Sequence, residues 1–236
     1  MAKVPQRRKP AIKPPEDTAA IRRAIDAAMN SLDAEGRKVG NAKFGVYAFY
    51  DYDGEPIYVG QTRESLRTRI RRHLTNQRTD AVAMNVLDPF EVADVEMWPF
   101  FDLDGKKATD STVRERLNAA EYTVFQRVLG ESKFAAVLNE KAIVPRDKVT
   151  LPASTKSRII PEDLYTLRKH PDVRIARRAS TIASLARVIS ERQVQVGLRQ
   201  TLVTQAKRLE WLASERFVEA GGESAVEVKS ADDDVN

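Results

Sequence analysis

The chain has 236 residues, 42% hydrophobic and 31% charged, which is typical of a soluble globular protein with one full core and an appendage. It has no cysteine, which excludes disulfides, thiolate zinc sites and cysteine nucleophiles and leads us to expect a cytoplasmic protein. The net charge of +5 favours a polyanionic partner, and no apolar run is long enough for a membrane span.

Proline content and charge divide the chain into segments. Residues 1–16 hold four prolines and five Lys or Arg residues, so we expect a disordered basic arm. A first folded unit is predicted over 17–144, and the proline-containing stretch 145–161 is interpreted as a linker. A helical region is predicted over 162–219, followed by a disordered acidic tail over 220–236.

Hydrophobic periodicity predicts the elements of the first unit. In chain order they are helix 17–35, strand 44–50, strand 56–60, helix 63–76, strand 91–101 and helix 111–129. The Asp53-Gly54 pair predicts a hairpin between the first two strands, and Asp110 or Ser111 is expected to cap the last helix. Residues 77–90 are interpreted as an insertion. Further helices are predicted over 162–168, 172–192 and 198–218, with Gly197 separating the last two.

Several side chains in this first unit suit phosphodiester hydrolysis. The reaction needs an activated water, a cation beside the developing negative charge, and help for the leaving oxygen. Arg69 can contact two phosphate oxygens at once. Glu121, beside the apolar stripe of its helix, can hold Mg²⁺. Tyr47 can accept a proton from water if neighbouring positive charge lowers its pKa.

These residues also have structural interpretations, and two other glutamates compete for the metal. Any single tyrosine, arginine or glutamate of this kind is more often a structural residue than a catalytic one. Glu115 competes with Glu121 for the metal, although it falls off the buried stripe, and Glu96 on the third strand is a weaker competitor. The presence of all these residues together is therefore stronger evidence for a hydrolytic site than any one of them alone.

The ordered set of motifs resembles the GIY-YIG nuclease family. It consists of Gly45-Val46-Tyr47, then Tyr58-Val59-Gly60, then Leu66-x-x-Arg69-Ile70-x-x-His73, then Glu121 and Asn139. The resemblance spans about residues 43–140. It implies an α+β fold in which a small three-stranded antiparallel sheet is flanked by helices, here with a C-terminal helical extension, and a one-metal hydrolysis of nucleic acid.

The resemblance also implies roles for the first group of site residues. Tyr47 would be the general base or would position the water, and Tyr58 would assist or orient it. Arg69 would bind the scissile phosphate, and His73 would support Tyr47 or the phosphate.

The remaining implied roles belong to residues outside this group. Glu121 would be the sole protein ligand of a Mg²⁺ or Mn²⁺ ion. Asn139 would hold the architecture of the site. Gly60 would allow a close approach of the backbone.

Arginines outside the motifs are candidates for binding the phosphate backbone of DNA. They are Arg63, Arg67, Arg71, Arg72, Arg174, Arg177 and Arg178. The two long C-terminal helices could pair with another copy, because one active site needs two copies, or two visits, to cut both strands of a duplex.

These observations lead to one main hypothesis and two alternatives. The main hypothesis is a divalent-metal-dependent DNA endonuclease of restriction or defence type. The first alternative is a non-catalytic nucleic-acid-binding or assembly module on the same fold. The second is a nuclease that acts on single-stranded DNA or RNA.

Overall fold

The computed structural model of the protein describes residues 15–74, 88–139, 143–194 and 196–223. Its strands are β1 (Gly45–Tyr50), β2 (Pro56–Thr62), β3 (Asp94–Pro99) and β4 (Thr155–Arg158). Its α-helices are α1 (Glu16–Met29), α2 (Leu66–Leu74), α4 (Ser111–Glu131), α5 (Glu162–Lys169), α6 (Pro171–Glu191) and α7 (Val196–Glu219). Most of the predicted basic arm, insertion and acidic tail lies outside the described residues.

The strands form one antiparallel sheet in the order β2-β1-β3-β4, which confirms the predicted α+β class. The central strand β1 places Tyr47 opposite Gly60 of β2 and Met97 of β3. The prediction of three strands was wrong by one, because β4 lies within the segment interpreted as a linker and pairs with β3. Its four residues alternate between half-buried and exposed positions and are all polar, so no apolar pattern marks them.

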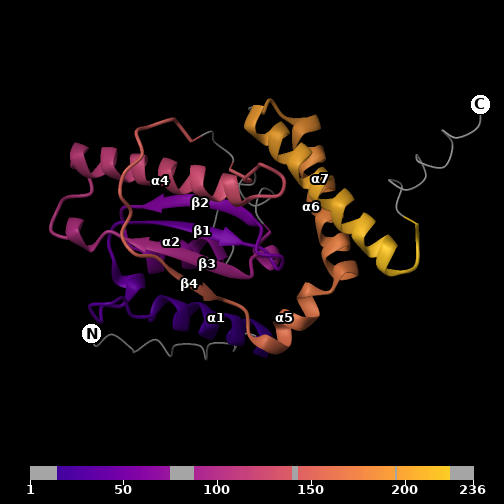
Figure 1. Ribbon diagram of the computed structural model, residues 1–236, viewed down its shortest axis with the longest axis horizontal. Coiled ribbons are helices and arrows are strands. Elements are labelled where there is room, and N and C mark those ends of the chain that lie inside the picture. Colours follow the sequence, from indigo (N-terminus) through magenta and orange to yellow (C-terminus); the bar gives the residue numbers. More distant parts are fainter. Residues whose placement is uncertain (1–14, 75–87, 140–142, 195, 224–236) are drawn as a thin grey trace, which may run out of the picture.

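Helices cover both faces of this sheet and enclose two hydrophobic cores (Figure 1). One core joins α1 and α2 to the face that carries Tyr47 and Phe49. The other joins α4 to the opposite face, which carries Val46 and Val59. The alternation of side chains along β1 and β2 therefore assigns each residue of the hairpin to one helix layer or the other.

Helix limits follow the prediction closely, with three corrections. Helix α1 ends at Met29 rather than at residue 35, and Leu32, within the predicted helix but beyond its end, is 59% exposed. Helix α2 begins at Leu66, because β2 continues past Gly60 as far as Thr62. Gly197 does not separate the C-terminal helices but lies within α7. The cap at Asp110 is confirmed, since its carboxylate accepts a hydrogen bond from the Thr112 backbone at 2.9 Å.

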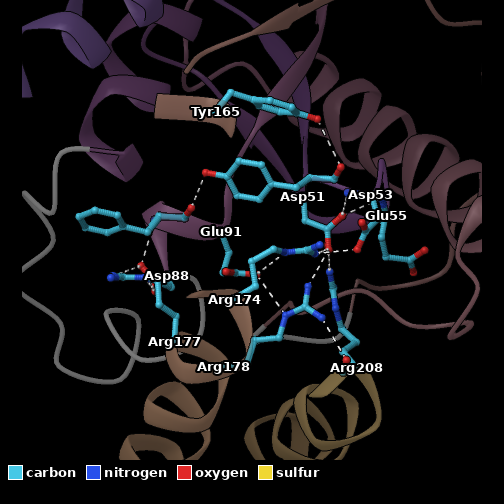
Figure 2. A network of polar contacts seen from close by, with 12 residues as sticks. Asp51, Asp53, Glu55, Asp88, Glu91, Tyr165, Arg174, Arg177, Arg178 and Arg208 are labelled. Atoms are coloured by element: carbon cyan, nitrogen blue, oxygen red, sulfur yellow. Dashed lines mark hydrogen bonds and ion pairs between the residues drawn. The ribbon is translucent and has the colours of Figure 1, made fainter. Parts of the chain in front are cut away.

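The C-terminal helices α6 and α7 pack together and dock on the turn between β1 and β2 through one buried carboxylate (Figure 2). Asp51 is 1% exposed, and its Oδ1 accepts the backbone N–H groups of Asp53 and Glu55, which shapes the turn. Its Oδ2 accepts hydrogen bonds from Arg174 at 3.2 Å, Arg178 at 2.8 Å and Arg208. A single side chain thus bonds to the hairpin turn and to both helices.

A second buried carboxylate balances this arginine cluster. Glu91 accepts a hydrogen bond from Arg178 at 3.1 Å and lies 3.9 Å from Arg174. Burial raises the pKa of Glu91, and the two arginines act in the opposite direction. Asp53 adds a third carboxylate, 2.7 Å from Arg174.

The prediction that Arg174 and Arg178 bind DNA is contradicted by this arrangement. Both side chains are 2% exposed and are committed to carboxylates of the sheet layer. Their helical spacing serves an internal ion-pair cluster, not a surface. Arg177 points elsewhere, is 37% exposed and pairs with Asp88 at 3.0 Å, so its contact with DNA stays a prediction.

Within the described ranges, none of the helices combines the length and apolar character that a membrane crossing requires.

Candidate active site

The hydroxyl of Tyr47 is the meeting point of two functional side chains. Tyr47 lies in the middle of the central strand and is fully buried. Its hydroxyl oxygen lies 3.0 Å from His73 Nε2, and Arg69 Nε donates a hydrogen bond to it at 3.3 Å. Because Arg69 and His73 are one turn apart on α2, one helix face delivers both groups to the phenol.

Tyr58 lies beside this pair on the neighbouring strand. Its ring stacks against that of Tyr47 with centroids 6.1 Å apart, and the His73 ring lies 5.2 Å from it. The structure requires a glycine at position 60, since a Cβ atom there would lie 2.6 Å from the Tyr47 hydroxyl and 2.8 Å from the Tyr58 ring. The predicted close approach at Gly60 is therefore to the two tyrosine side chains.

The electrostatic environment keeps Arg69 positively charged. Burial alone would lower the pKa of Arg69, but the Tyr47 and Tyr58 hydroxyls outweigh it, and the pKa is raised. A half-buried guanidinium held against two phenols is oriented before any substrate arrives. It can bind phosphate with little loss of side-chain freedom.

Glu121 reaches the site from the other helix layer. It lies on α4, and its Oε2 accepts a hydrogen bond from Gln61 Nε2 at 2.9 Å. The same amide donates to Asn118 Oδ1 at 2.7 Å. Burial raises the pKa of Glu121, while the Gln61 hydrogen bonds and the charge of Arg69 lower it. Arg69 and Glu121 thus interact electrostatically although they belong to helices on opposite faces of the sheet.

Asn139 closes the outer edge of β2. Its side-chain amide donates to the Val59 carbonyl at 2.7 Å and accepts from the Val59 N–H at 3.1 Å, as a paired strand would. The preceding residue, Leu138, donates its N–H to the Ile57 carbonyl at 2.9 Å. This position touches the strand that carries Tyr58 and Gln61, but any part of Asn139 in catalysis stays a prediction.

A cleft of about 630 Å³ opens beside these groups. It is lined by residues from the end of β2, the turn that leads to α2, α2 itself, the segment before α4, and α4. They are Gln61, Thr62, Arg63, Glu64, Arg69, Ala108, Thr109, Arg114 and Asn118. Glu121 lies next to this cleft, because Gln61 and Asn118, which form its hydrogen-bond chain, both line it.

The competing carboxylates are placed differently. Glu96 is buried on β3 and accepts hydrogen bonds from Tyr50 at 2.7 Å and Ser154 at 2.6 Å, with Arg127 at 3.3 Å. Its oxygens are already engaged within the sheet layer. Glu115 is exposed on α4. None of the three carboxylates is itself a lining residue of the cleft, but Glu121 accepts a hydrogen bond from Gln61, which lines it, and is therefore the better placed of the three.

Two of the four remaining arginines predicted to bind DNA are tied to the protein backbone. Arg63 lines the cleft and donates to the Ala108 carbonyl at 3.3 Å. Arg67 instead joins α2 to the end of α1, through the Met29 carbonyl at 3.1 Å and the Asn41 side chain at 3.2 Å.

The other two form exposed ion pairs. Arg71 pairs with Asp26 of α1, and Arg72 pairs with Glu64. Exposed pairs of this kind contribute little to stability and exchange readily with other ions. Contact of these four arginines with DNA stays a prediction.

Gln61 and Asn118 were missed by the sequence reasoning. Gln61 immediately follows the Tyr58-Val59-Gly60 motif, and Asn118 lies one turn before Glu121 on α4. That second spacing is a signal in the sequence, since residues three apart share a helix face. Their mutual contact, across 57 residues of chain, has no local signature.

The donor set suits a hard divalent cation with few protein ligands. Glu121 offers one carboxylate beside a spacious cleft, and no cluster of three His, Cys, Asp or Glu residues occurs in the described part of the chain. Mg²⁺ commonly takes one or two carboxylates, with waters and substrate oxygens completing its shell. A cation there would also offset the burial of the Glu121 charge.

Residues 43–104 match the family model of the GIY-YIG catalytic domain. The match includes Tyr47, Tyr58, Arg69 and His73 and ends before Glu121. No curated protein and no solved structure gave a significant match to the chain.

Proposed function

We propose that the chain, whose residues 43–104 match the family model of the GIY-YIG catalytic domain, is an endonuclease that hydrolyses DNA phosphodiester bonds with the help of Mg²⁺ or Mn²⁺. The observation that carries the proposal is the convergence at one cleft. Arg69 and His73 meet at the Tyr47 hydroxyl, and Glu121 lies beside the same cleft.

In the proposed reaction, Arg69 binds the scissile phosphate and stabilises the charge that develops on it. Tyr47 takes a proton from the attacking water and passes its own to His73 Nε2, which lies 3.0 Å away. The phosphate then bears the new oxygen, and the bond to the leaving oxygen breaks.

The metal would be held by Glu121, whose carboxylate Gln61 orients. When bound, the ion would supply stabilisation of the negative charge on the leaving oxygen.

A restriction or defence role is the pathway that we propose for this activity. The absence of cysteine speaks against a cysteine-ligated zinc linker of the kind found in homing endonucleases. Duplex cleavage by one active site needs two copies or two visits. We therefore propose that two copies of the chain pair through their C-terminal helices.

A plasmid incubation tests the function. We expect supercoiled DNA to be nicked or linearised with Mg²⁺ or Mn²⁺ and to remain intact with EDTA. Parallel reactions with single-stranded DNA and RNA measure which polymer is preferred. Salt-sensitive binding without cleavage under any metal would instead identify a non-catalytic binding module.

A further inference from the structure

One face of α4 carries a polar row that extends beyond Glu121. Arg114, Asn118 and Glu121 are spaced four and three residues apart, which places them on one side of the helix. Asn118 contacts Glu121 through Gln61, and Arg114 lines the cleft one turn further toward the start of the helix. The row therefore runs from Glu121, the proposed metal ligand, into the cleft and ends at the guanidinium of Arg114.

Three arginines from three parts of the fold line this cleft. Arg63 follows β2, Arg69 lies on α2, and Arg114 lies at the end of the first turn of α4. Among the described residues of the lining, Glu64 is the single carboxylate, and it pairs with Arg72 outside the cleft. The cleft thus presents an excess of positive charge to a ligand.

The size of the cleft exceeds the needs of one phosphate group. Its volume of about 630 Å³ lies in the range that encloses a drug-sized molecule. Arg69 is held near the Tyr47 hydroxyl, so in the proposed reaction it binds only the scissile phosphate. Arg114 belongs to a different element and has room for a second anionic group.

We propose that Arg114, assisted by Arg63, binds a second phosphate of the same nucleic-acid strand, next to the one at Arg69. The inference rests on the proposed nuclease function and adds a subsite to it. Arg114 acts on the backbone rather than on bases, because an exposed guanidinium among small polar side chains offers charge without a shaped base pocket. Its contribution is to affinity and strand placement, not to the chemical step.

The test is DNA binding by Arg114→Ala beside Arg116→Ala. Arg116 is two residues further along the same helix, is exposed, and pairs with Asp102 away from the cleft. Fluorescence anisotropy with labelled duplexes of two unrelated sequences, in EDTA and at several KCl concentrations, gives the Kd of each variant. We expect Arg114→Ala to raise Kd about 10-fold on both sequences and to reduce the salt slope by about 1. Arg116→Ala should match the wild type, and Arg114→Lys should retain most of the affinity.

The outcomes separate this subsite from the nuclease assignment. If the wild type cuts DNA and Arg114→Ala binds as Arg116→Ala does, the subsite is wrong and the function stands. If Arg114→Ala binds normally but cuts slowly at saturating DNA, Arg114 serves the chemistry and the proposal is overturned. If the wild type neither binds nor cuts DNA, the proposed function fails as well. Urea unfolding of each variant confirms that the compared proteins are equally folded.

Discussion

Arg69→Ala is expected to lower the single-turnover rate of DNA cleavage by at least about 100-fold. The guanidinium is oriented by the Tyr47 hydroxyl before substrate binds, and its removal takes away the cation that we propose to bind the scissile phosphate. It also leaves the Tyr47 oxygen without the positive charge that favours its deprotonation. Rapid-quench measurement at saturating DNA separates this effect from any loss of affinity.

Two further variants make that result specific to Arg69. Arg69→Lys keeps the charge but loses the planar two-pronged contact, so its rate should fall between those of the wild type and the alanine variant. Arg23→Ala removes an exposed cation of α1 that pairs with Glu16, and should cut at the normal rate. A wild-type rate in Arg69→Ala would remove this residue from the mechanism.

Asp51→Ala is expected to lower the free energy of unfolding by about 3–5 kcal/mol, the cost of breaking a buried ion pair from one side. Three arginines share one oxygen of this carboxylate, and its other oxygen organises the hairpin turn. Arg208, almost wholly buried, already has a lowered pKa, chiefly because burial disfavours its charge, and Asp51 opposes that effect. Against a typical total stability of about 5–15 kcal/mol, the loss would be severe.

Asp26→Ala provides the matched comparison, measured by urea denaturation on the same day. It also removes an aspartate from an arginine pair, but both partners are more than 40% exposed. Such pairs contribute about 1 kcal/mol or less, so this variant should unfold near the wild-type midpoint. Equal stabilities for Asp51→Ala and Asp26→Ala would show that the buried cluster does not hold the helices to the sheet.

The hairpin of the candidate active site was predictable because its signals are local. Tyr47 and Tyr58 each lie in a short apolar run, the Asp53-Gly54 turn joins the two runs, and Arg69 and His73 share a helix face. Each of these patterns is complete within a few residues. The sequence therefore predicted which side chains meet on the α2 face of the sheet.

The role of the C-terminal arginines was not predictable in the same way. A helix with arginines at regular spacing fits a solvated face, a DNA contact or a buried ion-pair cluster equally well. The choice depends on Asp51, which lies 123 residues before Arg174 and 157 before Arg208 in the chain. Strand β4 was missed for a related reason, because its pairing with β3 depends on the backbone and its side chains are polar.

Glu121 has a local signal in the sequence, but its contacts are distant in the chain. Its position against the apolar stripe of α4 marked it as a carboxylate that needs a partner. The partner is Gln61, 60 residues earlier, on the strand that also carries Tyr58. The pattern identified the residue, and only the packing of α4 on the sheet identified its neighbours.

The most direct test of the account is the single-turnover cleavage rate of Glu121→Gln in Mg²⁺, measured beside Glu115→Gln on the same helix. We expect Glu121→Gln to be folded, to bind DNA and to cut at least about 100-fold more slowly, because its amide is a poor ligand for the ion. Glu115→Gln, altered at an exposed position outside the cleft, should cut normally. Normal cutting by Glu121→Gln would contradict the proposal that this carboxylate holds the metal of the site.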